Sequence, residues 1–221
     1  MDLEYFSYAT FHDLQEPLKI ISNFSDLLEK ELTGQLTKET QLYFNFISSS
    51  IVRMSKLTES MMTYLKLGKN DHQMEQVSLS SILDKVLTNN QALIRQKKAI
   101  IQSDLPPIKI NCFPQQIEML LSHLINNGLK FNKHQQPQLI IAGVKKNQEW
   151  SFSIKDNGIG ISEQYKDLIY RPFKRLNSQE DFPGSGIGLS ICRRITTLHG
   201  GKIWHASNKS GGTTFYFTIS Q

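Results

Sequence analysis

The sequence predicts an α+β fold, in which an N-terminal helical hairpin dimerises into a four-helix bundle and precedes an α/β sandwich with a mixed sheet. Two observations lead to this prediction. Residues 1–68 contain two stripes of mostly apolar side chains at helical spacing. Residues 77–221 instead combine amphipathic helical segments with short runs of strand-forming residues. The polar, unpatterned residues 69–76 between them indicate a linker.

The two stripes of the first region repeat at alternating spacings of three and four, which is the pattern of a seam between packed helices. Their members are Phe11, Leu14, Leu18, Ile21, Ser25 and Leu28 in the first stripe and Ile47, Ile51, Met54, Thr58, Met61 and Leu65 in the second. Residues 32–38 between them supply Thr, Gly and polar side chains, which predict a turn. Because two helices bury such stripes poorly, we expect two hairpins to pair as a homodimer with twofold symmetry. The alternative is a seam that packs on the rest of the same chain.

The second region mixes helices and strands, and several expected strands are neighbours along the chain. We expect helices at 79–95, 114–131 and 187–198, and strands at 100–101, 108–110, 139–144, 150–155, 202–206 and 213–219. Adjacent strands joined by short turns form antiparallel hairpins, whereas strands separated by a helix favour parallel pairing. The sequence therefore predicts a mixed sheet.

The composition narrows the classes of function. No run of about 18 apolar residues occurs, and no basic stretch followed by an apolar one opens the chain, so we expect a cytoplasmic location and no membrane contact from this segment. The net charge is +5, but Lys and Arg are scattered, so we expect no nucleic-acid partner. Cys112 and Cys192 lie far apart and outside any metal-binding spacing.

Two glycine clusters point to a phosphate-bearing ligand. One, at 156–161, follows a predicted strand and begins with Asp156; the other, at 184–189, opens a predicted helix. Glycine lets a ligand approach the backbone closely, and helix N-termini favour phosphate. A dinucleotide-binding fingerprint is excluded because Leu189 stands where its last glycine would be. A P-loop is excluded because the sequence contains no Gly-Lys-Ser or Gly-Lys-Thr tripeptide. The clusters therefore predict a nucleotide site of another kind.

The helix before these clusters supplies polar groups for such a site. Asn127 and Lys130 lie three residues apart and share one helix face with His123. An amide oxygen and a cation on one face suit a metal ion paired with phosphate, since Mg²⁺ takes oxygen ligands and few of them from protein. An ordinary polar helix face is the alternative.

Together these segments resemble the ATP-binding domain of sensor histidine kinases, in the wider superfamily of gyrase, mismatch-repair ATPases and the ninety-kilodalton heat-shock chaperone. Residues 123–131 match the N-box, the two glycine clusters match the glycine boxes, and residues 170–176 look like the phenylalanine box. This sequence departs from the family at His123, where Asn is usual, and at Gly128, where Ala is usual.

The resemblance implies ATP and Mg²⁺ as cofactors, with a mobile lid between Phe173 and Gly186. It implies that Asp156 accepts a hydrogen bond from the adenine amino group, that Asn127 binds Mg²⁺ and that Lys130 contacts phosphate. The ATP-binding residues that it implies are Asn127, Lys130, Phe131, Asp156, Gly158, Gly160, Phe173, Gly184, Gly186, Gly188 and Leu189.

An exposed histidine on the first helix completes the pattern. With Phe11 and Leu14 in the seam, His12 faces outward. Asp13 supplies a carboxylate that could hold one ring N–H and leave the other nitrogen as nucleophile. Pro17 removes a helical hydrogen bond and is expected to bend the helix just past His12. The segment 11–18 is similar to the H-box of the same kinases, in its phytochrome-type form, which implies that His12 is the phosphoacceptor and Asp13 a general base or orienting acceptor.

The order of H-box, N-box, glycine boxes and phenylalanine box covers residues 7–218. It implies a protein histidine kinase core that autophosphorylates His12 with ATP and passes the phosphoryl group to an Asp of a response-regulator receiver domain. A sensor domain would lie upstream or on a separate chain. Two alternatives stay open: a non-catalytic dimeric ATP-binding signalling module, which His123 favours, and a conformational ATPase of the same superfamily, which has no need of an H-box.

Overall fold

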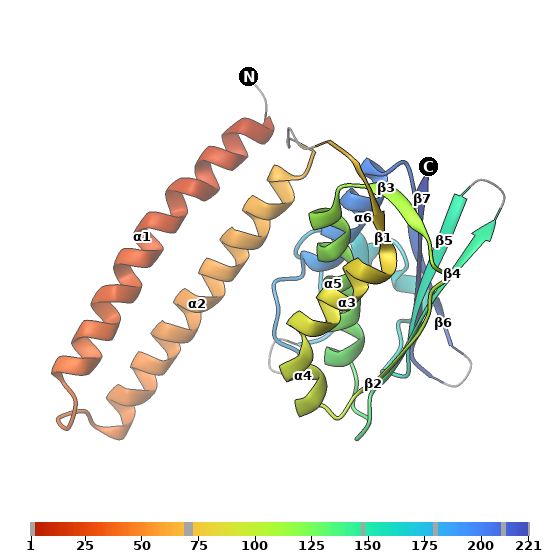
Figure 1. Cartoon of the computed structure of the whole chain (residues 1–221). Helices are drawn as coiled ribbons and strands as arrows, with labels where there is room; N and C mark the ends of the chain where they lie inside the picture. The colour runs from red at the N-terminus through yellow and green to blue at the C-terminus, as the bar shows by residue number, and fades with distance from the viewer. Residues whose placement is uncertain (1–2, 69–72, 147–148, 179–180, 209–210, 221) are drawn as a thin grey trace. The chain divides into compact units, whose positions relative to one another are not determined.

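The computed structural model describes residues 3–68, 73–146, 149–178, 181–208 and 211–220 (Figure 1). The chain divides into two compact units, Met1–Lys69 and Asn70–Gln221. None of the helices among the described residues is long and apolar enough to cross a membrane.

The first unit is a hairpin of two long helices, α1 (Leu3–Glu31) and α2 (Lys38–Lys66). The turn between them contains Gly34 in the left-handed region, at φ 85°. The N-cap of α2 is Thr37, whose hydroxyl accepts a hydrogen bond of 3.1 Å from the backbone N–H of Thr40. α1 continues as one helix through Pro17, so the missing hydrogen bond does not end it.

The predicted seam divides into two layers that differ in burial. One layer closes the hairpin, since Leu18, Ser25, Ile51, Thr58 and Leu65 are buried. Five members of the other layer, which alternate with these, stay about half exposed: Leu14 46%, Ile21 50%, Leu28 50%, Ile47 46% and Met54 45%. The sixth, Met61, is partly buried. The seam is therefore only partly used in the described hairpin.

The second unit is built on a five-stranded sheet in the order β2-β4-β5-β7-β6. The strands are β2 (Ile100–Asp104), β4 (Gln138–Lys146), β5 (Glu149–Asp156), β6 (Ile203–Ser207) and β7 (Thr213–Ser220). β2 and β4 run parallel, and the other neighbours are antiparallel, which confirms the predicted mixed sheet. A separate antiparallel pair joins β1 (Glu75–Ser78) to β3 (Lys109–Cys112).

Helices cover one face of this sheet (Figure 1). They are α3 (Leu79–Asn89), α4 (Gln91–Gln96), α5 (Pro114–Lys130) and α6 (Gly188–Leu198), and two short 3₁₀ turns, η1 (Glu163–Tyr165) and η2 (Leu168–Tyr170), lie before the last. Alternate residues of the central strands, such as Phe152 and Phe217, are almost fully buried, and so are Leu121 and Ile125 of α5. The core therefore lies between helices and sheet, as the predicted sandwich requires.

Two local differences from the sequence-based prediction have physical causes. The helix expected at 79–95 is divided at Asn90, whose side-chain amide donates a 2.8 Å hydrogen bond to the Val86 carbonyl and competes with helix continuation. Glu75 pairs with Cys112 as the first residue of β1, inside the segment expected to be linker. The earlier linker positions 69–72 lie outside the described residues.

Candidate functional site

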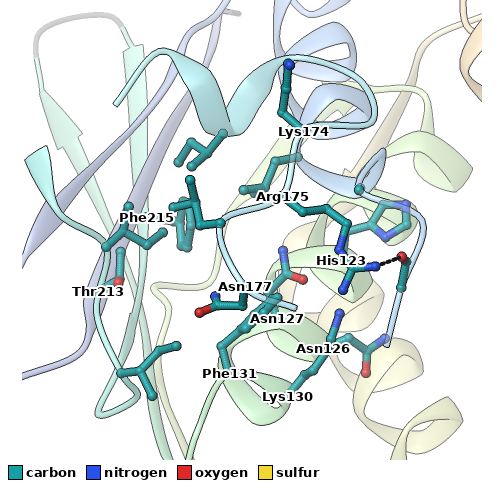
Figure 2. A pocket seen from close by; sticks show the side chains of 18 of the residues that line it. His123, Asn126, Asn127, Lys130, Phe131, Lys174, Arg175, Asn177, Thr213 and Phe215 are labelled. Atoms are coloured by element: carbon teal, nitrogen blue, oxygen red, sulfur yellow. Dashed lines mark hydrogen bonds between the residues drawn. The ribbon is translucent and has the colours of Figure 1, made fainter. Parts of the chain in front are cut away.

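A pocket of about 310 Å³ lies where α5, the end of β5, the start of β7 and the segment before α6 meet (Figure 2). Most of the sequence-predicted ATP-binding residues line it: Asn127, Lys130, Phe131, Asp156, Gly160, Gly184, Gly186, Gly188 and Leu189. Gly158 and Phe173 do not. A Cβ on Gly158 would lie 2.4 Å from the Phe131 carbonyl oxygen. Glycine at this position therefore lets two backbone segments pack closely together outside the pocket lining.

The acidic residue among those that line the pocket is Asp156, at the end of β5. Its side chain is 8% exposed, and Oδ1 accepts backbone hydrogen bonds from Gly158 (2.8 Å) and Thr213 (3.0 Å). Burial raises the pKa of this carboxyl, and the two hydrogen bonds act in the opposite direction. Among the described residues no donor reaches Oδ2. One carboxylate oxygen is thus fixed by the fold and the other can accept a ligand's hydrogen bond.

α5 contributes a polar face above a buried apolar one. Pro114 occupies its first turn, where the missing N–H costs nothing, and an apolar stripe anchors the helix on the sheet. Asn127 lines the pocket, and so does Asn126, whose amide donates 3.3 Å to the Ser122 hydroxyl. The Asn126 Oδ1 is buried and has no hydrogen-bond partner among the described residues. An orphaned buried acceptor of this kind indicates that a ligand or water belongs there.

Three cationic residues line the same pocket, Lys130, Lys174 and Arg175. The Lys130 ammonium lies 4.4 Å from the Phe131 ring centroid. Burial, and after it the charge of Arg175, lower the pKa of Lys130. Because these cations repel each other when nothing lies between them, an anion in the pocket would be bound favourably.

The segment from Phe173 to Gly186 is held together by Arg175. Its guanidinium donates to the carbonyls of Gly184 (3.0 Å), Ser178 (2.9 Å) and Phe182 (2.7 Å), the first of which is drawn in Figure 2. The base of the segment is closed by a 3.1 Å bond from the Phe173 N–H to the Gly186 carbonyl. Phe173 and Gly186 both have a positive φ. Phe173 is 47% exposed and is not among the residues that line the pocket.

The start of α6 offers backbone donors to the pocket. Its N-cap is Ile187, which has no side-chain hydrogen-bonding group, so the first N–H groups of the helix have no cap. Gly186, Gly188 and Leu189 bring this end of the helix to the pocket wall. Unpaired N–H groups at a helix N-terminus attract phosphate.

The sequence analysis did not assign several lining residues. Those with apolar side chains are Ile159, Ile161, Ile169, Leu176 and Phe215, and the polar ones are Asn126, Lys174, Arg175, Asn177, Ser185 and Thr213. Ile159 and Ile161 alternate with the glycines of the first cluster, a signal that was available in the sequence. Thr213 and Phe215 come close only through the pairing of β7 with β5, which no local pattern reveals.

His12 lies on α1 with its side chain 66% exposed. Its Nδ1 is 3.2 Å from Oδ1 of Asp13, although neighbouring side chains on a helix diverge by roughly 100°. The carboxylate therefore bends back to the ring. A proton on Nδ1 would be donated to Asp13, and Nε2 would carry the free lone pair. Among the described residues no group of three or more His, Cys, Asp or Glu side chains forms a metal cluster.

Two family models match the two regions of the chain. The model of the His Kinase A (phospho-acceptor) domain matches residues 3–70, and that of the histidine kinase-, DNA gyrase B-, and HSP90-like ATPase matches residues 113–221. The chain is 35% identical over 219 residues to cyanobacterial phytochrome A of Nostoc sp.. The aligned residues make up 99% of this chain and 28% of that protein. The chain thus spans less than a third of that relative's length.

Two solved structures share the fold. Full-length ShkA in complex with AMPPNP has a TM-score of 0.72 at 19% identity, over 97% of this chain and 45% of its own. Histidine kinase ThkA in complex with response regulator protein TrrA has a TM-score of 0.67 at 21% identity, over 98% and 61%. The two matched domains, the relative and the order of sequence motifs agree, and the chain belongs to the sensor histidine kinases, as a phosphoacceptor domain followed by an ATP-binding domain.

Proposed function

We propose that this chain binds ATP with Mg²⁺ in the pocket beside α5 and transfers the γ-phosphoryl group to His12. One observation carries the proposal: a single pocket combines a buried carboxylate that has one open oxygen, three cationic residues and a helix start without a side-chain cap. These groups match the two ends of ATP, a base with an amino donor and an anionic triphosphate.

The pocket fits the adenine base at one end. The open Oδ2 of Asp156 is an acceptor for the amino group, and Ile159, Ile161 and Phe215 supply apolar surface for the ring faces. A buried acceptor discriminates strongly for a ligand donor, because a ligand without the donor leaves the carboxylate unpaired. This selects adenine over a base that presents a carbonyl there.

The pocket fits the phosphates at its other end. Lys130 and Arg175 would face the phosphate oxygens, and the first N–H groups of α6 would donate to them. Asn127 would hold Mg²⁺ through its amide oxygen, in keeping with the few protein ligands that this ion takes. When bound, Mg²⁺ neutralises charge on the phosphates.

The acceptor chemistry follows from the His12–Asp13 pair. The Nε2 lone pair attacks the γ-phosphorus, an N–P bond forms, and the bond from that phosphorus to the β–γ bridging oxygen breaks, so ADP leaves. Positive charge develops on the imidazole, and the Nδ1 proton is held by the Asp13 carboxylate. The product is a phosphohistidine on an exposed helix face.

The hairpin's open layer supports a homodimer, with residues 1–68 as its dimerisation domain, 69–76 as linker and 77–221 as the ATP-binding domain. A second copy would cover Leu14, Ile21 and Leu28, which are about half exposed in one chain. Phospho-His12 would then pass its phosphoryl group to an Asp of a response-regulator receiver domain, and a sensor domain upstream or on another chain would set the rate. The ThkA–TrrA complex is consistent with such a partner.

The test uses γ-labelled ATP with Mg²⁺ on this chain and on His12→Gln. Label that is acid-labile, alkali-stable and absent from the variant supports autophosphorylation of His12, provided that both proteins bind a non-hydrolysable ATP analogue equally. Hydrolysis of ATP without protein labelling would favour a conformational ATPase instead. Nucleotide binding with neither labelling nor hydrolysis would favour a non-catalytic module.

A further inference from the structure

Two buried polar side chains meet outside the pocket lining, and the proposed chemistry uses neither of them. Tyr170 ends the 3₁₀ turn η2, and His205 lies in the middle of β6, at the edge of the sheet. The two residues are 7% and 8% exposed, and their ring centroids are 6.4 Å apart. Among the described residues, no group forms a hydrogen bond with the Tyr170 hydroxyl or with Nε2 of His205. Buried polar atoms are costly unless something pairs with them, so both atoms call for a partner.

The side chains around the pair contact the rings and leave these two atoms unpaired. The guanidinium carbon of Arg193 lies 5.9 Å from the Tyr170 ring centroid, so this cation faces the ring. The Phe215 ring lies 5.9 Å from the imidazole, centroid to centroid. Burial lowers the pKa of His205, against the attraction of the Glu163 carboxylate. Burial also raises the pKa of Tyr170, so at neutral pH the phenol keeps its proton and the imidazole is uncharged.

A water molecule has the size and the hydrogen-bonding groups that this pair requires. Water can accept a hydrogen bond from a phenol and donate one to an imidazole lone pair at the same time. Buried waters in proteins commonly join polar groups that have no other partner. The alternative is a direct hydrogen bond from the hydroxyl to Nε2, which the described geometry does not contain.

The pair lies next to residues of the pocket wall. Ile169 directly precedes Tyr170 and lines the pocket. Phe215 lies opposite His205 in the register of β6 and β7, and it lines the pocket as well. A link between Tyr170 and His205 would therefore hold two apolar parts of the wall together from behind.

We propose that one buried water molecule bridges the Tyr170 hydroxyl and Nε2 of His205, and that this bridge positions the pocket wall by tying η2 to β6. The hydroxyl donates to the water, and the water donates to Nε2. The bridge itself is independent of the proposed nucleotide function, whereas its effect on the pocket rests on that function.

The first experiment is a double-mutant cycle on the whole chain with Tyr170→Phe and His205→Leu, in which urea unfolding gives the folding equilibrium constant of the ATP-binding unit. Each single change removes one end of the bridge and should lower this constant about tenfold. The double variant removes both polar atoms and should cost no more than either single variant. Tyr216→Phe is the matched control, because Tyr216 lies on the opposite face of the sheet from His205, and its effect should be independent of His205→Leu. Independent effects of Tyr170→Phe and His205→Leu would overturn the proposal.

A second experiment uses the unmodified chain and so does not depend on the stability of a variant. A crystal structure at a resolution that shows ordered water should place one water molecule within about 3.2 Å of both the Tyr170 hydroxyl and Nε2 of His205. A hydroxyl bonded directly to Nε2, or two side chains that point apart, overturns the bridge.

The effect on the pocket is measured as affinity for a non-hydrolysable ATP analogue by calorimetry. We expect a several-fold loss in Tyr170→Phe and no change in Tyr216→Phe, because only the first hydroxyl supports the wall. Unchanged affinity in a folded Tyr170→Phe protein overturns the role of the bridge in the pocket. Failure of the unmodified chain to bind the analogue overturns the proposed nucleotide function instead, and the cycle and the crystal structure still decide whether the bridge exists.

Discussion

The two units of this chain treat their apolar side chains in opposite ways. In the ATP-binding unit, Ile117, Leu120, Ile125 and Leu129 of α5 are fully buried. In the hairpin, large apolar side chains remain exposed on both helices: Leu14, Ile20, Ile21, Phe24, Leu27, Leu28, Leu42, Tyr43, Phe46, Ile47, Val52 and Met54. The ATP-binding unit buries its core by itself, whereas the hairpin leaves a large apolar surface that the proposed second copy would cover.

The polar residues proposed to act in each unit show the opposite pattern of burial. His12 and Asp13 stand at the exposed surface of the incomplete unit, and Asp156 is buried in the complete one. An exposed imidazole can meet partners of different shape, while a buried carboxylate can select one ligand by unpaired hydrogen bonding. Variants that disturb one unit and not the other would test this contrast.

The largest effect is expected from a charge in the open layer of the hairpin. Ile21→Glu should raise the dissociation constant of the dimer at least about a hundredfold, because each copy loses about 1.5–3 kcal/mol of apolar burial and gains a buried charge. Sedimentation equilibrium measures the dissociation constant. Thermal unfolding of the ATP-binding unit should not change.

Two hairpin variants separate the layers. Lys19→Glu places the same charge on an exposed polar position and should leave the dimer intact. Leu18→Glu enters the buried layer and should unfold the hairpin itself, seen as a loss of helical circular dichroism. If Ile21→Glu remains as dimeric as the unmodified chain, the open layer is not the dimer interface.

The next effect concerns the nucleotide. Asp156→Asn should weaken binding of an ATP analogue by roughly 2–4 kcal/mol, because an amide N–H₂ would replace the open acceptor and face the adenine amino group. The Asn Oδ1 can still accept from Gly158 and Thr213, so the fold should survive. Calorimetric titration gives the affinity.

Lys155→Gln is the matched control for this variant. It is the preceding residue, exposed and on the opposite face of β5, so its affinity for the analogue should equal that of the unmodified chain. An Asp156→Asn protein that is folded and binds with unchanged affinity would remove the carboxylate from the proposed adenine contact.

The hairpin could be predicted because its stripes repeat over many turns, yet the sequence could not say which layer closes it. Leu18 and Ile21 are equally apolar, and only the packing of α1 on α2 buries the first and exposes the second. The mixed sheet was predictable from neighbouring strands. The break at Asn90 was not, because a side-chain bond to Val86 decides it.

Sequence patterns within single segments identified several of the residues that line the pocket. Asn127 and all the predicted glycines except Gly158 line the pocket, and short local sequence patterns were enough to identify them. Arg175 could not be assigned, since its partners are carbonyls of Ser178, Phe182 and Gly184 that only the folded segment brings together. Phe173 was expected to contact ATP. Its backbone has a φ of 64°, its side chain is exposed, and it is not among the residues that line the pocket.

A smaller effect is expected from pH, again in the ATP-binding unit. Burial lowers the pKa of His123, His199 and His205, and Nε2 of His199 accepts a 3.1 Å bond from the Phe113 N–H. Below the unfolded value of about 6.5, the unfolded chain binds more protons than the folded one. The free energy of unfolding should therefore fall as pH decreases from 7.5 to 5.5, by up to about 1.4 kcal/mol per pH unit for each histidine.

Urea unfolding at several pH values measures this slope. The Asp156→Asn background is useful, because burial raises the pKa of that carboxyl and its contribution has the opposite sign. His199→Gln in this background should flatten the slope. A slope that is unchanged without His199 would show that this histidine takes up its proton equally in both states.

The smallest expected effect is on stability, when a glycine in the packed core or a glycine in the exposed hairpin turn is replaced by alanine. A Cβ on Gly128 would lie 2.5 Å from Cδ2 of Leu139, so Gly128→Ala forces that side chain to move at about 1–3 kcal/mol, offset by about 1 kcal/mol of helix propensity. A Cβ on Gly34, in the hairpin turn at φ 85°, meets nothing within 4 Å, and Gly34→Ala should cost only backbone strain of about 1 kcal/mol.

Double-mutant cycles tell these two costs apart, although their sizes are similar. Leu139→Val shortens the side chain that the new methyl would strike, so it should relieve part of the cost of Gly128→Ala by about 0.5 kcal/mol or more, measured by urea unfolding. The same Leu139→Val change should add independently to Gly34→Ala. Additive costs in both cycles would mean that Leu139 does not limit the space at Gly128, and that this part of the core accepts the larger residue as readily as the turn does.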